Sequence, residues 1–115
     1  MSITEQVGFH HWKEFGAVPL ERIGMKLGEE AGELQGALVR LCEERDGEDW
    51  LPEVESELKD VLVVLIRIAY GFGWDVHELV QAAGVRFCER TWPGVKPVKS
   101  LSETDPQTNK PDWEG

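Results

Sequence analysis

Apolar residues recur at intervals of three and four along most of the chain, which is the spacing of an amphipathic α-helix. The clearest case lies between residues 20 and 44, where the apolar seam consists of Leu27, Ala31, Leu34, Leu38 and Leu41. A further helix is predicted from Pro52 to Tyr70, and its second half is apolar on nearly every side. Such a helix is typical of the centre of a fold, so we expect it to be buried.

Two shorter helices complete the pattern. The first is predicted over residues 3 to 15, and the last runs from Asp75 to about Arg90. Asp75 is expected to act as N-cap, with Glu78 completing a capping box. Gly16 to Pro19 and Gly71 to Gly73 interrupt the helical pattern, and the polar residues 43 to 50 predict a surface loop. The expected fold is an all-α bundle of four to five helices.

The chain of 115 residues has the length of a single domain. We expect a helical domain over residues 1–93 and an extended C-terminal tail over residues 94–115, where periodicity is lost after Pro93. A helical chain of this size buries only a small core. We therefore expect a homodimer or homotetramer to complete the bundle.

Two pairs of acidic residues stand three positions apart on these helices. Glu30 and Glu33 belong to the second helix, and Glu57 and Asp60 lie where the third becomes apolar. This spacing puts both side chains of a pair on one helix face. If the helices pack side by side, the four carboxylates converge, and their oxygens suit Mg²⁺, or Mn²⁺ in its place.

Glu-Glu-x-x-Glu-Leu at residues 29 to 34, followed by Glu-Leu-x-Asp-Val-Leu at residues 57 to 62, resembles the all-α nucleoside triphosphate pyrophosphohydrolases, the MazG-like superfamily. The resemblance extends over residues 8 to 92 and also includes dimeric dUTPases and phosphoribosyl-ATP pyrophosphohydrolases. It implies Mg²⁺-dependent hydrolysis of nucleoside triphosphates, modified or non-standard ones included, to a monophosphate and pyrophosphate. The biological role would be sanitation of the nucleotide pool.

The resemblance also implies roles for individual residues. Glu30, Glu33, Glu57 and Asp60 would be the metal ligands and the catalytic residues. A carboxylate not fully used by the metal would orient the attacking water, and either Glu33 or Glu29 would serve.

Substrate-binding candidates come from cationic and aromatic residues. Lys26 lies one turn before Glu30, and Arg86 and Arg90 match a Lys/Arg-Phe-x-x-Arg pattern of the family; each would contact phosphate or simply lie on the surface near a helix terminus. Trp12 would stack on a base or belong to the core. His10 and His11 are adjacent, so they point about 100° apart and predict no metal site.

Glycine occupies two informative kinds of position. Gly24, Gly28, Gly32 and Gly36 recur every four residues, which favours close approach of another backbone or a ligand on that side. Gly84 stands where relatives of the resembled family often carry an Asn that contacts the nucleotide. That departure favours an alternative, a non-catalytic helical module that binds metal, nucleotide or another protein. Within the superfamily, the alternative is an enzyme selective for dUTP, dCTP or phosphoribosyl-ATP.

Composition narrows the partners and the compartment. The net charge of -10 argues against nucleic acid as a partner, because phosphate neutralisation needs clustered Lys and Arg. No run of 18 apolar residues predicts a membrane span, and the first residues lack the features of a signal peptide. Cys42 and Cys88 are expected to be reduced thiols, which favours a cytoplasmic protein.

Overall fold

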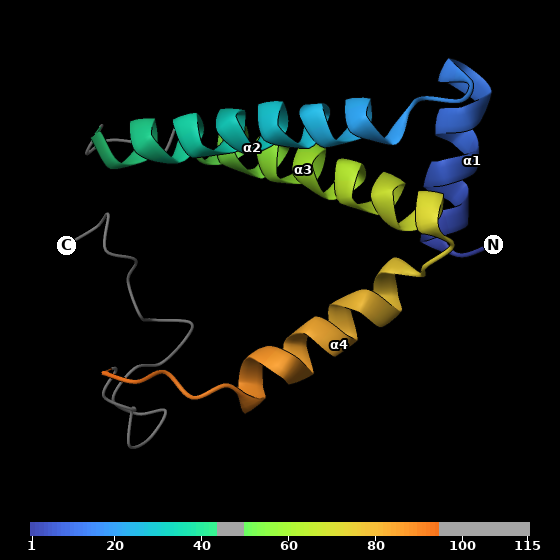
Figure 1. Cartoon of the computed structure of the whole chain (residues 1–115). Coiled ribbons are helices and arrows are strands. Elements are labelled where there is room, and N and C mark those ends of the chain that lie inside the picture. The colour runs from blue at the N-terminus through green and yellow to red at the C-terminus, as the bar shows by residue number, and fades with distance from the viewer. Residues whose placement is uncertain (44–49, 95–115) are drawn as a thin grey trace.

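The computed structural model describes residues 1–43 and 50–94, and within these residues the fold is all-α, as predicted (Figure 1). Its helices are α1 (Ile3–Phe15), α2 (Leu20–Glu43), α3 (Leu51–Phe72) and α4 (Val76–Glu89). The predicted surface loop at residues 43 to 50 falls almost entirely outside the described residues, and so does the predicted tail beyond Gly94.

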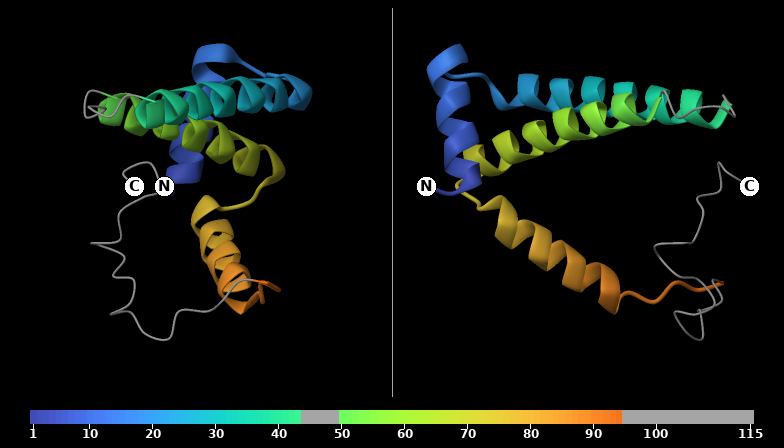
Figure 2. Two further views of the ribbon diagram at one scale, coloured as in Figure 1. Left: turned by 90° about the vertical axis from the view of Figure 1, so that its left-hand side faces the viewer. Right: turned by 180° about the vertical axis from the view of Figure 1, so that it is seen from behind.

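Helices α2 and α3 lie side by side along most of their length, and α1 crosses one end of this pair (Figures 1 and 2). Helix α3 is the common element, because it packs against α2, α1 and the start of α4. Helix α4 leaves the end of α3 and diverges from the α2–α3 pair (Figure 1). The chain therefore places its carboxylate-bearing helices together and leaves α4 projecting.

Glycine ends two of the helices in the manner expected of a residue without a Cβ. Gly73 follows α3 with φ 75° and its N–H donates to the carbonyl oxygens of Ala69 and Tyr70. Gly16 follows α1 with φ 69° and its N–H donates to Trp12. Other residues adopt such positive φ angles only at a cost. Helix α3 runs two residues beyond the predicted end at Tyr70, because the αL turn falls at Gly73.

The start of α4 is capped differently from the sequence prediction. Asp75 occupies the N-cap position, but its side chain accepts no hydrogen bond from the first turn of α4. The hydroxyl of Thr4 on α1 instead satisfies the first N–H group of α4: it accepts from the N–H of Val76 at 2.9 Å and donates to Asp75 Oδ1 at 3.1 Å. The predicted N-cap position of Asp75 is confirmed, but its predicted side-chain cap is wrong, because Asp75 Oδ1 accepts from the Thr4 hydroxyl instead. This arrangement ties α1 to α4.

The core of the single chain is small. Among residues 1–43 and 50–94, its buried apolar members are Ile23, Ala37, Leu41, Val64 and Ala69. The expectation that the apolar α3 is buried on nearly every side was wrong for this chain, since Leu58, Leu62 and Leu65 are 46%, 47% and 41% exposed. The reason is geometric: α1 and α2 cover one side of α3, and α4 turns away from the other.

The glycine row on α2 faces open space in this chain. A Cβ at Gly24, Gly28, Gly32 or Gly36 would meet no atom of another described element within 4 Å, so none of the described helices makes the expected close approach. Close contact occurs instead at Gly8 on α1, where a Cβ would overlap the ring of Tyr70 on α3. Within the described residues, no helix combines the length and the apolar character needed to cross a membrane.

Candidate metal centre

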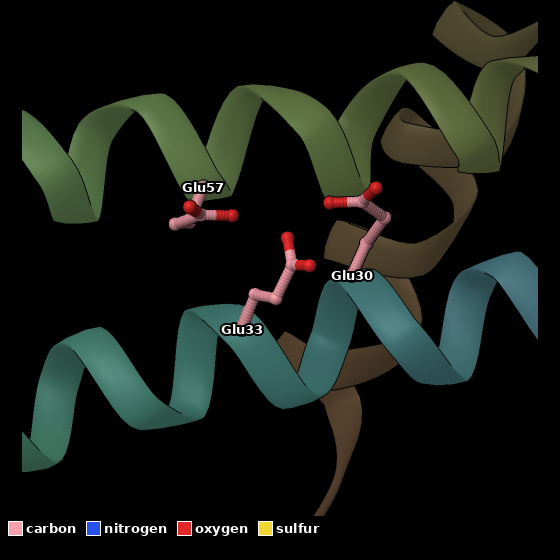
Figure 3. A group of neighbouring side chains, drawn as sticks. All are labelled: Glu30, Glu33 and Glu57. Atoms are coloured by element: carbon pink, nitrogen blue, oxygen red, sulfur yellow. The ribbon is translucent and has the colours of Figure 1, made fainter.

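Side-by-side packing of α2 and α3 brings carboxylates from both helices to one point. Glu30 and Glu33 come from successive turns of α2, and Glu57 faces them from α3 (Figure 3). One oxygen of each residue lies within 4.8 Å of the others. We call Glu30, Glu33 and Glu57 the carboxylate trio. The spacing of three within α2 sets the first two members, and the contact between α2 and α3 adds the third.

The negative charge of the trio is only partly balanced by described cationic side chains. Glu30 is 7% exposed, and its Oε1 lies 3.0 Å from Lys26 Nζ. The other oxygen of Glu30 and Oε2 of Glu57 are buried and have no hydrogen-bond partner. A carboxylate oxygen that loses water without gaining a donor is destabilised in its charged form. A cation placed among the three residues would supply the missing partner.

Proton affinities in the trio reflect the same crowding. The pKa of Glu57 is raised to about 7, first by hydrogen bonding of its protonated form to Glu53, then by loss of water contact, and then by Glu33. The pKa of Glu33 is also raised, chiefly by Glu30. The pKa of Lys26 is raised by its hydrogen bond to Glu30 and by the charge of Glu29. Neighbouring carboxylates therefore resist simultaneous ionisation unless a further cation is present.

Asp60, the fourth predicted ligand, lies apart from this group. It is exposed, and the carboxylate trio does not include it. It lines a cavity together with Glu30, one turn further along α3 than Glu57. The structure thus brings together three of the four predicted ligands and places Asp60 on the adjoining wall.

Two hollows adjoin the trio on either side. The larger has a volume of about 570 Å³ and lies between α1, α2 and α3. Its lining residues are His11, Phe15, Val18, Arg22, Ile23, Lys26, Glu30, Asp60, Val63, Val64 and Arg67. We call it the apolar cavity, because its exposed wall is mostly apolar. The smaller, of about 410 Å³, contains Glu33 and Glu57 together with Glu29, Glu53, Arg40 and the glycines Gly32 and Gly36.

The predicted phosphate-binding residues divide between two places. Lys26 lies beside the trio and also contacts Glu29 at 3.6 Å. Arg86 and Arg90 lie on and just after α4, where they line a separate shallow hollow with Ala83 and Phe87. Since α4 diverges from α2 and α3, the single chain does not bring these two arginines to the trio.

Helix α1 contributes a residue other than the predicted one. Trp12 is 57% exposed, packs near Phe9 and lines neither hollow beside the trio. Its neighbour His11 lines the apolar cavity, and its Nδ1 is buried without a hydrogen-bond partner. Loss of water contact, Arg67 and His10 lower the pKa of His11. The helical offset of four between His11 and Phe15, which places both on one face, was the signal available in the sequence.

Arg67 was also missed by the sequence analysis. It lies deep in the apolar stretch of α3, is 8% exposed and lines the apolar cavity. The available signal was the charge itself, since an arginine inside a buried apolar run needs a partner.

The donor set of the trio fits a hard divalent ion. Mg²⁺ and Mn²⁺ prefer carboxylate oxygens, and Glu30 and Glu57 each have a buried oxygen without a partner.

Comparison of the chain with family models, with curated proteins and with solved structures yields no match.

Proposed function

We propose that the protein is an all-α, Mg²⁺-dependent nucleoside triphosphate pyrophosphohydrolase that releases a nucleoside monophosphate and pyrophosphate. The observation that carries this proposal is the carboxylate trio, which combines residues from two helices within 4.8 Å and borders a cavity of about 570 Å³. The volume is that of a small-molecule site. We propose a nucleoside triphosphate as the substrate because the acidic motifs of α2 and α3 resemble those of the MazG-like superfamily.

The trio would hold the ion through Glu30, Glu33 and Glu57, with Asp60 as a further ligand from the cavity wall. When bound, Mg²⁺ offsets the negative charge of the phosphate oxygens and makes water a stronger acid. Glu33 is the exposed member of the trio, so it is placed to orient the attacking water and accept its proton. Glu29 is the alternative for that role, since it lines the adjoining smaller hollow.

Lys26 would contribute a charge to substrate binding at the mouth of the apolar cavity. Its ammonium group contacts Glu30 in this structure and its side chain is 53% exposed, so the group would turn toward a phosphate once a metal ion occupies the carboxylates. Arg86 and Arg90 would reach a phosphate only from a second chain, because α4 of the same chain points away from the trio.

A second copy of the chain is therefore part of the proposal. The uncovered face of α3 carries Leu58, Leu62 and Leu65, each more than two-fifths exposed at 46%, 47% and 41%. Apolar surface of this kind is stabilised by a partner helix. Association into a homodimer or homotetramer would cover this face and would allow α4 of one chain to approach the trio of another.

The principal alternative is a helical module that binds a nucleotide or metal without turnover. Gly84 favours it, because no side chain is available at that position of α4 for a hydrogen bond to the nucleotide. Selectivity for dUTP, dCTP or phosphoribosyl-ATP is the alternative within the enzyme class.

The deciding experiment is incubation of the purified protein with a panel of nucleoside triphosphates and Mg²⁺, with detection of pyrophosphate. We expect release that requires the metal and is lost in Glu33→Gln. The matched control is Glu55→Gln, an exposed glutamate on α3 whose carboxylate pairs with Lys59 at 3.0 Å, which should keep wild-type activity. Calorimetry with a non-hydrolysable triphosphate completes the test, since binding without turnover would establish the alternative module.

A further inference from the structure

The apolar cavity has room and apolar surface for a part of a ligand other than its phosphates. Phe15 and Val18 near α1, Ile23 on α2, and Val63 and Val64 on α3 supply apolar wall around its volume of about 570 Å³. Glu30 belongs both to this cavity and to the carboxylate trio. A ligand whose phosphates are held at the trio would therefore have its remaining part next to the opening of the cavity.

Arg67 is the unusual residue of this wall. It is 8% exposed, its Nε has no hydrogen-bond partner, and no described carboxylate lies within ion-pairing distance of it. Its guanidinium group lies 5.9 Å from the centre of the Tyr70 ring. A guanidinium group does not lose its proton in proteins. Its burial is therefore unfavourable until an acceptor occupies the cavity.

His11 lies on the same wall and is also incompletely paired. Its Nδ1 is buried without a partner, and its ring lies 4.8 Å from that of Phe15. The proximity of Arg67 lowers the pKa of His11, after the larger effect of lost water contact. An apolar cavity with a few polar groups on its wall is the usual form of a small-molecule site, in which the polar groups orient the ligand.

We infer, given the proposed pyrophosphohydrolase function, that the apolar cavity receives the base of the nucleotide and that Arg67 determines which base is accepted. The parallel N–H groups of a guanidinium match a base edge with two adjacent acceptors. Guanine offers O6 and N7, and cytosine offers O2 and N3. Adenine has single acceptors at N1 and at N7, and the neighbour of each is its amino group, which is a donor. One N–H group of Arg67 would therefore remain unpaired against adenine.

The pyrophosphate end of the substrate fits the cavity less well. Its oxygens need donors or cations on every side, whereas most of the cavity wall is apolar. The exposed cations Lys26 and Arg22 lie on the lining with Glu30, where phosphates held at the trio would lie. The base is thus the part of the nucleotide that matches the wall around Arg67.

The test is calorimetric binding of GMP, CMP, UMP and AMP to the full chain in the presence of Mg²⁺, which needs no turnover. We expect GMP or CMP to bind on the order of tenfold more tightly than AMP. Arg67→Met and Arg67→Lys should both reduce this preference, the second because a lysine keeps the charge but lacks the paired donors. Lys59→Met, which removes an exposed cation of the same helix, should leave the preference unchanged.

Stability provides a separate readout for Arg67→Met. Because the buried guanidinium has an Nε without a hydrogen-bond partner and no described carboxylate beside it, the nucleotide-free variant should melt no lower than the wild type. Equal binding of the four monophosphates, no binding of any of them, or a preference retained in Arg67→Met would overturn the inference. The inference would also be overturned if tripolyphosphate competed with the monophosphates for the wild type but not for Arg67→Met. That result would place a phosphate, and not the base, beside Arg67. A base preference without pyrophosphate release would instead refute the proposed activity and leave the base site standing.

Discussion

Tyr70 of α3 lies against Gly8 of α1 so closely that a Cβ at residue 8 would overlap the phenol ring. Gly8 is buried, and the same ring faces the guanidinium of Arg67 at 5.9 Å. The absence of a side chain at Gly8 therefore sets how closely α1 approaches α3. It also sets the position of the aromatic ring that faces Arg67.

Gly8→Ala should destabilise the fold by about 1–3 kcal/mol, the usual cost of overpacking a fitted contact. The control is Gly24→Ala on α2, where a Cβ meets nothing within 4 Å. That substitution should stabilise the helix by up to about 1 kcal/mol, because alanine is the better helix former. Thermal unfolding of the two variants measures both effects. Equal melting temperatures would contradict the tight α1–α3 contact.

Thr4→Val should lower the melting temperature and loosen α4. The substitution preserves shape but removes the hydroxyl that accepts from Val76 N–H and donates to Asp75. Loss of a helix cap costs about 1 kcal/mol. Thr4→Ser keeps the hydroxyl and should retain most of the stability. Amide hydrogen exchange at the start of α4 reports the effect locally, and unchanged protection in Thr4→Val would mean that the cap does not hold α4.

Metal-free protein should lose stability as pH rises from about 4.5 toward about 7. The pKa of Glu57 is raised from 4.5 to about 7 in the folded state, so the folded chain binds a proton here more tightly than the unfolded chain does. The stabilising proton is fully present at low pH and is lost as pH passes through the folded pKa. Melting temperatures across this range should therefore fall more steeply for the wild type than for Glu57→Gln.

Metal binding should show the opposite dependence on pH. Mg²⁺ competes with the proton on Glu57, so its affinity should rise as pH increases toward about 7 and binding should release protons. Calorimetry in buffers of different ionisation enthalpy measures that release. A proton release that is unchanged in Glu57→Gln would show that another group carries the linkage.

Mixed oligomers test whether α4 of one chain serves the trio of another. A chain with Glu57→Gln and a chain with Arg86→Ala and Arg90→Ala should each be inactive alone. Random mixing into dimers should restore about a quarter of wild-type activity, because half the dimers then contain one intact site of two. Activity that stays absent in the mixture, despite proven exchange of subunits, would place the arginines and carboxylates of a working site in the same chain.

The sequence alone determined the positions of the helices and the shared face of Glu30 and Glu33 on α2. Periodicity located each helix to within a few residues, because helical spacing is a local property of the chain. The spacing of three between Glu30 and Glu33 likewise put both on one face of α2 without reference to any other element. Glycine marked the ends of α1 and α3 for the same local reason.

Contacts between helices decided the rest. Only the packing of α2 on α3 adds Glu57 to the trio and leaves Asp60 on the cavity wall. Only the crossing of α1 brings the Thr4 hydroxyl to the first N–H group of α4 and places His11 with Arg67 on the wall of the apolar cavity. These relationships depend on distances between residues far apart in the chain. Hydrophobic periodicity carries no information about such distances, because it describes the face of each helix and not the element that covers it.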